Sequence, residues 1–194
     1  MQTTSLRSIL KSATASEHAA LEALPCQQRL LAADCQIIDY ARVLHGYGRA
    51  IAAVDQELFH LTWPESCPYL PRLPLLNQDL LSLYPGAAKV SSHLSSHALL
   101  HPWGIRYVIE GMSLGAQWML AKAAIFRNPL AREASSFFQF QPTPWPRFCD
   151  DLEKLGTSGE VVAEVTAAAN WMFQKFRHEL SAESAGLSPK LLAS

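Results

Sequence analysis

Apolar side chains recur at three- and four-residue steps along almost the whole 194-residue chain. This spacing gathers them on one face of a helix, and prolines and glycines interrupt it at intervals. No run alternates apolar and polar residues between turn signals, as a half-buried strand would. The pattern predicts an all-α protein of about seven helices. Because no linker or internal repeat divides the chain, we expect a single domain over residues 1–194.

The prolines indicate where the helices begin and end. A first helix is expected from about residue 6 to residue 24, ending near Pro25, and a second of about 24 residues is expected after Asp34, a candidate N-cap. Pro102 suits the first position of a helix, where its missing amide is not needed. That helix, expected over 102–126, is apolar nearly all round, which predicts a central, buried position. Further helices are expected near 79–84, 87–100, 146–155 and 159–180, while the stretch 137–140 matches no pattern clearly.

Composition excludes several classes of protein. Hydrophobic residues make up 49% of the chain and charged residues 17%, less charge than the quarter or so of an average soluble domain. The net charge of -1 includes no basic stripe, so nucleic acid is not an expected partner. The start has no signal-peptide pattern, and charged residues interrupt the most apolar stretch, so we expect a cytoplasmic protein and no membrane partner. The widely spaced Cys26, Cys35, Cys67 and Cys149 are expected to be reduced and mostly buried.

His18 lies on the edge of the apolar face of the first expected helix. A half-buried imidazole can offer one ring nitrogen to a metal while the other is held by a hydrogen bond. Lys11 lies two turns earlier on the same side, about 10 Å away, which would suit haem iron and a haem propionate. A hydrogen-bonded histidine at a helix interface is the alternative. Glu17 falls inside the apolar stripe without a sequence-level explanation.

Gly111 and Gly115 lie one turn apart in the helix that begins at Pro102. Each costs about 1 kcal/mol relative to alanine in a helix interior. Two explanations remain open at this point. One is close packing of the helix against another, and the other is a flat ligand pressed against bare backbone.

His93, His97 and His101 recur at four-residue steps and would stack on one helical face. Two such histidines can share a metal, but Pro102 breaks the helix at the third, and a solvated face is the alternative. The chain contains no nucleophile elbow and no phosphate-binding glycine loop.

Two segments together resemble the bacterial haem oxygenase family. Leu10 to Glu22, which reads LKSATASEHAALE, is similar to that family's proximal-helix motif, and Tyr107 to Gln117, which reads YVIEGMSLGAQ, is similar to its distal-helix motif. Weaker matches follow the family's order at 40–48, 72–80 and 145–152. The resemblance spans nearly the whole chain, and it is specific in the combination of His18 with the two glycines.

The resemblance implies a haem oxygenase-like bundle that holds haem between the first helix and a kinked distal helix. It implies cleavage of haem, as substrate and cofactor, to biliverdin, CO and ferrous iron with O₂. His18 would be the iron ligand, and Lys11, with Arg7 and Arg147 as weaker candidates, would meet the propionates. Gly111 and Gly115 would bring the backbone against the porphyrin, with Ser113 beside the reacting oxygen.

The same resemblance implies further partners. Electrons would come from an external donor, either a ferredoxin or flavodoxin reductase system or an NADPH-dependent reductase. A bilin-binding photoreceptor could accept the product.

The distal segment departs from the family pattern. Met112 stands where many members have a small polar residue, and Ala116 stands in place of a glycine. The stretch 138–140 also lacks the Tyr-Gly often found there. Because these changes affect proton delivery more than haem binding, a haem carrier or sensor without ring-opening activity remains an alternative. A third is a helical enzyme of the wider fold group that binds no haem, such as a thiaminase-like protein.

Overall fold

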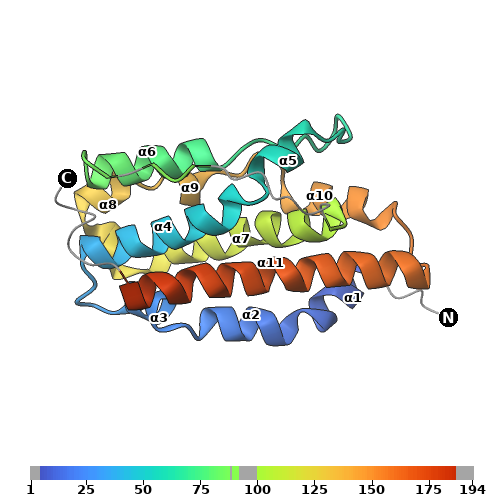
Figure 1. Ribbon diagram of the computed structural model, residues 1–194, viewed down its shortest axis with the longest axis horizontal. Helices are drawn as coiled ribbons and strands as arrows, with labels where there is room; N and C mark the ends of the chain where they lie inside the picture. Colours follow the sequence, from blue (N-terminus) through green and yellow to red (C-terminus); the bar gives the residue numbers. More distant parts are fainter. Residues whose placement is uncertain (1–4, 88, 92–99, 187–194) are drawn as a thin grey trace.

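A computed structural model describes residues 5–87, 89–91 and 100–186, and within these it contains eleven α-helices, one short 3₁₀ helix and no strand (Figure 1). The all-α prediction is therefore confirmed. The helices are α1 (Leu6–Ala13), α2 (Ala15–Glu22), α3 (Pro25–Leu31), α4 (Ile37–Ala52), α5 (Asp55–His60), α6 (Leu73–Leu83), α7 (Pro102–Lys122), η1 (Ala124–Arg127), α8 (Pro129–Glu133), α9 (Ser136–Gln139), α10 (Trp145–Glu153) and α11 (Gly159–Gly186). No described helix is both long enough and apolar enough to cross a bilayer.

The longest helix, α11, is the common support of the bundle. It packs against α7, α4 and α2, and also along α1 and α3. In Figure 1 the α1–α2 segment, α7 and α11 all run in the same direction along the long axis of the molecule. An equal number of residues therefore covers about the same distance along the long axis in each of these helices, because each helix advances about 1.5 Å per residue.

The expected first helix is in fact two helices that meet at Thr14. Thr14 is 3% exposed, and its hydroxyl donates to the Leu10 carbonyl at 2.8 Å, so it satisfies one of the carbonyls at the end of α1 locally. Glu153 of α10 caps the other end of α1 by accepting from the amides of Leu6 and Arg7. Lys11 and His18 consequently lie on either side of a helix break.

The expected second helix is also divided. Asp34 does not cap it, because the Asp34 carboxylate pairs with Arg29 at 2.7 Å. The helix α4 begins after Gln36, whose backbone amide donates to the Asp39 carboxylate. The helix ends at Ala52 and restarts as α5 at Asp55. The buried carboxylate of Asp55 accepts hydrogen bonds from the connector 67–73, which draws the chain out of the line of α4.

Several other boundaries differ from expectation. The helix α6 begins six residues before Asp79, and α9 forms in the stretch that gave no clear pattern, because Asp79 accepts from the amides of Ser136 and Phe137. Pro102 does begin α7, which ends at Lys122 and not near residue 126. Most of the helix expected over 87–100, including His93 and His97, lies outside the described residues, and the described Ala87, 89–91 and Leu100 are not helical.

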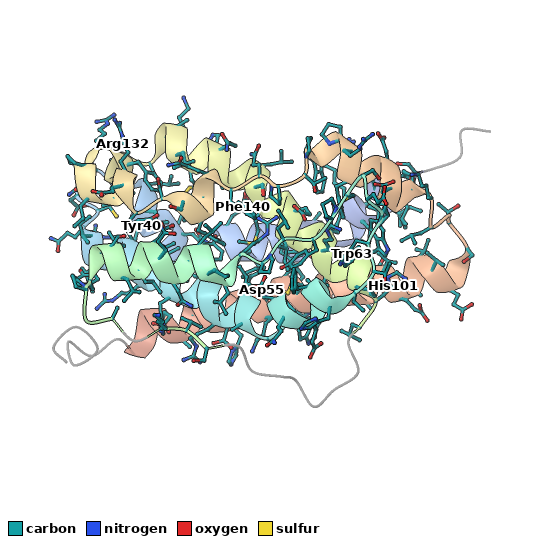
Figure 2. The ribbon with its side chains drawn as sticks, turned by 90° about the horizontal axis from the view of Figure 1, so that it is seen from above. Tyr40, Asp55, Trp63, His101, Arg132 and Phe140 are labelled. Atoms are coloured by element: carbon teal, nitrogen blue, oxygen red, sulfur yellow. The ribbon has the colours of Figure 1, made fainter. Side chains whose placement is uncertain are left out.

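Aromatic side chains fill the core from end to end. Tyr40 and Arg132 mark one end of the bundle and Trp63 and His101 the other, with Asp55 and Phe140 between them (Figure 2). At the first end, Tyr40 donates to the Ala134 carbonyl at 2.6 Å and contacts the rings of Phe126 and Phe138. None of the four cysteines forms a disulfide bond, as expected, but only Cys67 and Cys149 are buried, whereas Cys26 and Cys35 are half-buried.

Candidate functional site

The helix α7 is buried in its first half only. Gly104 to Glu110 are buried, whereas Leu114 is 49% and Trp118 52% exposed. The expectation of a buried helix therefore holds for the first half of α7 and fails for most of the second half. Large apolar side chains at this exposure indicate a surface that the described residues do not cover.

Three glycines on one face of α7 show how that surface arises. Gly104, Gly111 and Gly115 fall within about 40° of one another on the helical wheel at ~100° per residue. A Cβ at Gly104 would lie 2.2 Å from the Val165 carbonyl oxygen of α11. At Gly111 the nearest atoms would be those of the Trp145 ring, at 3.7 Å, and at Gly115 nothing lies within 4 Å. The face that touches α11 at Gly104 therefore meets open space three turns later.

This result decides between the two explanations of the glycine pair. Helix packing requires glycine at Gly104, but a Cβ at Gly111 would make only ordinary van der Waals contact and one at Gly115 would make none. Close packing therefore does not account for Gly111 and Gly115. We call the surface formed by Gly111, Leu114, Gly115 and Trp118 the open face of α7.

His18 lies on α2, and its side chain is 56% exposed. Its ring meets the edge of Phe173 of α11 at a centroid distance of 5.6 Å. Its Nδ1 atom lies 3.6 Å from a carboxylate oxygen of Glu22, one turn further along α2. Phe173 thus supports one side of the His18 ring, while the exposed imidazole can present a ring nitrogen to a ligand.

The register of the three parallel helices brings His18 level with Gly111. On α11, Gly104 faces residues 165–169, so Gly111, seven residues later, is level with about residues 172–176. That stretch holds Phe173, which contacts His18. Independently, the Thr14 hydroxyl lies near the Tyr107 phenol, and four residues beyond each lie His18 and Gly111.

Glu17 holds α2 in this register. Its carboxylate accepts from Gln174 at 2.9 Å and pairs with Arg177 at 2.9 Å, both on α11. This explains why an acidic residue falls inside the apolar stripe of the sequence. The partner residues lie more than 150 positions away, so no local pattern could have revealed the contact.

The three expected propionate partners are exposed side chains on two helices. Lys11 and Arg7 belong to α1 and Arg147 to α10. Burial raises the pKa of the Cys149 thiol, and the nearby positive charge of Arg7 acts in the opposite direction. Burial raises the pKa of the Tyr107 phenol, and the Thr14 hydrogen bond and the Arg7 charge act in the opposite direction.

Ser113 lies on the other side of α7, about 200° around the helix from Gly111. It is 8% exposed, and its hydroxyl accepts from Arg72 at 3.2 Å. Arg72 in turn pairs with Glu110 at 2.6 Å, and Glu110 pairs with Arg106 at 3.0 Å. The structure therefore places Gly111 level with His18 along the bundle and Ser113 in a buried ionic network on the other side of α7. Met112 packs partly against the core.

The buried network is the largest polar feature that the sequence did not predict. Arg106 is fully buried, donates to the carbonyls of Cys67 and Pro68 at 2.8 Å and stacks over Trp63 at 4.5 Å. The charges that interrupt the apolar stretch of α7 are thus neutralised inside the bundle. The i, i+4 spacing of Arg106 and Glu110 was the one sign of this network in the sequence. The third member, Arg72, comes from a connector far away in the chain, so no local pattern links it to them.

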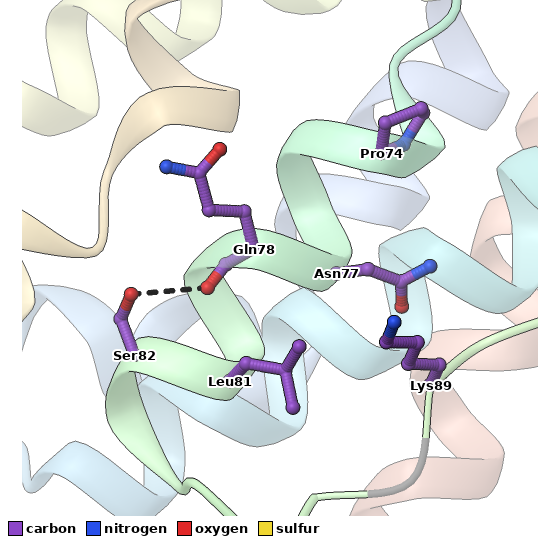
Figure 3. A pocket seen from close by; sticks show the side chains of 6 residues that line it. All are labelled: Pro74, Asn77, Gln78, Leu81, Ser82 and Lys89. Atoms are coloured by element: carbon purple, nitrogen blue, oxygen red, sulfur yellow. Dashed lines mark hydrogen bonds between the residues drawn. The ribbon is translucent and has the colours of Figure 1, made fainter.

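A separate pocket of about 530 Å³ lies over α6 (Figure 3). Its lining residues are Pro74, Asn77, Gln78, Leu81, Ser82 and Lys89, and none of them belongs to α2 or α7. No group of three His, Cys, Asp or Glu side chains among the described residues is arranged to hold a metal ion. Burial lowers the pKa of His101, the one described member of the His93, His97 and His101 series.

Comparison with known proteins gives one relative of high coverage. The chain is 34% identical over 152 residues to a protein named "Heme oxygenase" from Xanthomonas campestris pv. campestris (strain 8004). The aligned part covers 75% of this chain and 90% of that relative. No protein-family model matches the chain.

Proposed function

This chain belongs to the haem oxygenase family, and on that premise we propose that it cleaves haem oxidatively to biliverdin, CO and ferrous iron. Haem would bind between α2 and the open face of α7. The observation that carries the proposal is the exposed His18 at the level of a glycine face that, at Gly115, no described residue covers.

The residues present fit a flat tetrapyrrole. Bare backbone at Gly115 with open space in front of it can approach a planar ring closely. Leu114 supplies apolar surface beside it, and Phe173 closes the space behind His18. Lys11, Arg7 and Arg147 supply cations that can reach ligand carboxylates from the solvent side.

In this proposal His18 would hold the iron through Nε2. The Glu22 carboxylate lies 3.6 Å from Nδ1 and, on closer approach, would favour the tautomer with its proton on Nδ1. When bound, the haem supplies the iron at which O₂ is reduced and the ring carbon that is oxidised. Electrons come from an external donor, of the ferredoxin, flavodoxin or NADPH-dependent reductase type.

The residues of α7 orient the ligand and exclude water. Gly111 and Gly115 set how closely the ring approaches the helix. Ser113, bound to Arg72 behind the helix, acts as a positioning residue, because the buried network holds the rotation of α7 about its own axis. Rotation by one residue would replace the glycines with bulkier side chains.

The direct test is a haem titration of the purified protein. A Soret band is expected in the wild-type protein and in His60→Ala, a control at an exposed histidine of α5. His18→Ala should lose or strongly shift the band while its helical content stays unchanged. No Soret band in the wild-type protein would exclude haem as the ligand.

Turnover is tested by adding a reductant and O₂ to the haem complex. Decay of the Soret band with formation of biliverdin is expected. A His18-dependent haem complex that never yields a bilin would instead favour a carrier or sensor on this fold, the function that Met112 in the distal helix makes conceivable.

A further inference from the structure

Trp118 differs from the other tryptophans of the protein in its exposure to solvent. All five tryptophans lie within the described residues, and Trp118 is the one that is exposed, with 52% of its surface accessible. Trp63, Trp103 and Trp145 contact other aromatic rings of the core. An exposed indole near the end of α7 leaves apolar surface in water that the described residues do not cover, as is typical of a ligand or partner site.

Trp118 lies on the same face of α7 as the two glycines. It is about 20° from Gly111 on the helical wheel, and its Cα lies about 4.5 Å beyond that of Gly115 along the axis. Side chains on a helix lean toward its N-terminus, so the indole leans toward the turn that contains Leu114 and Gly115. No described atom lies within 4 Å of a Cβ at Gly115, so the backbone beside the indole stays open.

We propose that Trp118 is a haem-binding residue that packs against the edge of the porphyrin and closes the far end of the open face of α7. This inference rests on the proposed function, because the ligand is the haem of that proposal. The contact of Trp118 is made by the apolar indole and does not depend on the iron bond at His18 or on pairing with the propionates. We assign the porphyrin as the ligand that covers Trp118, because the bare backbone at Gly115 admits a flat ring next to the indole.

The first experiment measures how fast haem leaves the protein. Haem transfer to an excess of apomyoglobin should be about tenfold faster from Trp118→Ala than from wild type, since removal of the indole exposes apolar surface of the ring. Trp118→Phe, which keeps an aromatic ring, should lie between them. Phe59→Ala removes an equally exposed aromatic residue on α5, 50% accessible, and should leave the rate unchanged.

The second experiment detects the contact without catalysis. The protein is labelled with 5-fluorotryptophan, and the ¹⁹F resonance of Trp118 is identified by its absence in Trp118→Phe. Zinc protoporphyrin IX, which cannot turn over, should shift this resonance by its ring current. The resonance of Trp63, which donates to the Leu58 carbonyl and stacks on Arg106 behind α7, should not move.

The outcomes separate this inference from the proposed function. If neither haem nor zinc protoporphyrin IX binds, the proposed function fails and the inference fails with it. If both bind but the Trp118 resonance stays in place and Trp118→Ala releases haem at the wild-type rate, the inference alone is overturned. A change in oligomeric state in Trp118→Ala with unchanged haem release would likewise overturn it, in favour of a second copy of the chain as the occupant.

Discussion

Arg72 and Glu110 form an ion pair of 2.6 Å in which neither side chain is more than 3% exposed. Glu110 immediately precedes Gly111, so this pair joins the connector before α6 to the start of the open face of α7. Arg106, which is fully buried, holds the other carboxylate oxygen at 3.0 Å. One carboxylate is therefore shared by two buried guanidinium groups directly behind the candidate site.

Removal of Glu110 should destabilise the protein strongly. Glu110→Ala leaves two buried arginines without their shared counter-charge, and such a loss costs about 3–5 kcal/mol of the free energy of unfolding. Urea unfolding followed by circular dichroism measures it. Glu133→Ala, at an exposed position of α8, should change the value by less than about 0.5 kcal/mol. Equal losses in the two variants would show that the network contributes nothing specific.

Substitution of Gly104 should weaken the packing of α7 on α11. In Gly104→Ala the new methyl group would lie 2.2 Å from the Val165 carbonyl oxygen and 2.7 Å from the Ala168 Cβ, so the helices must separate. Overpacking of this kind costs about 1–3 kcal/mol or more. Thermal and urea unfolding should both show the loss, and an unchanged midpoint would mean that α7 and α11 are less closely packed at this point.

Gly115→Ala should have the opposite effect on stability. Its methyl group meets nothing within 4 Å, and alanine is favoured over glycine in a helix by about 1 kcal/mol. The variant without haem should therefore be slightly more stable than wild type, while its affinity for haem should fall because the methyl group occupies the ligand's space. Parallel unfolding and Soret titrations test both effects, and a stabilised variant with wild-type affinity would contradict a ligand at this face.

Acid should destabilise the contact between α4 and α11 through Glu179. Burial alone would raise the pKa of Glu179, but hydrogen bonds from Lys175 and Arg49 outweigh it and lower the pKa from 4.5 to about 2. A carboxylate with a depressed pKa in the folded state contributes stability above pH 4.5, and that contribution disappears as the pH falls toward 2. The free energy of unfolding should therefore decline over this interval.

Glu179→Gln provides the control for this pH dependence. It keeps the shape of the side chain but removes the titrating group, so its unfolding free energy should be lower than that of wild type at neutral pH and should fall less between pH 4.5 and 2. Parallel curves for the two proteins would assign the acid sensitivity to other carboxylates.

The sequence alone determined the fold class and the family. The three- and four-residue spacing of apolar side chains required helices, and Pro102 placed the start of α7 correctly because a proline there costs no hydrogen bond. These are properties of neighbouring residues, which a sequence displays directly. His18, Gly111 and Gly115 could be selected for the same reason, since their spacing within two helices is local.

Only the tertiary structure decided what those residues face. Gly104, Gly111 and Gly115 look alike in the sequence, yet Gly104 is crowded by α11 and Gly115 faces open space. Ser113 belongs to the buried network behind the helix because Arg72 arrives from a distant connector. The break at Thr14 and the partners of Glu17 likewise depend on contacts between separate helices, whose alignment is set by packing over the whole bundle and not by any local run of residues.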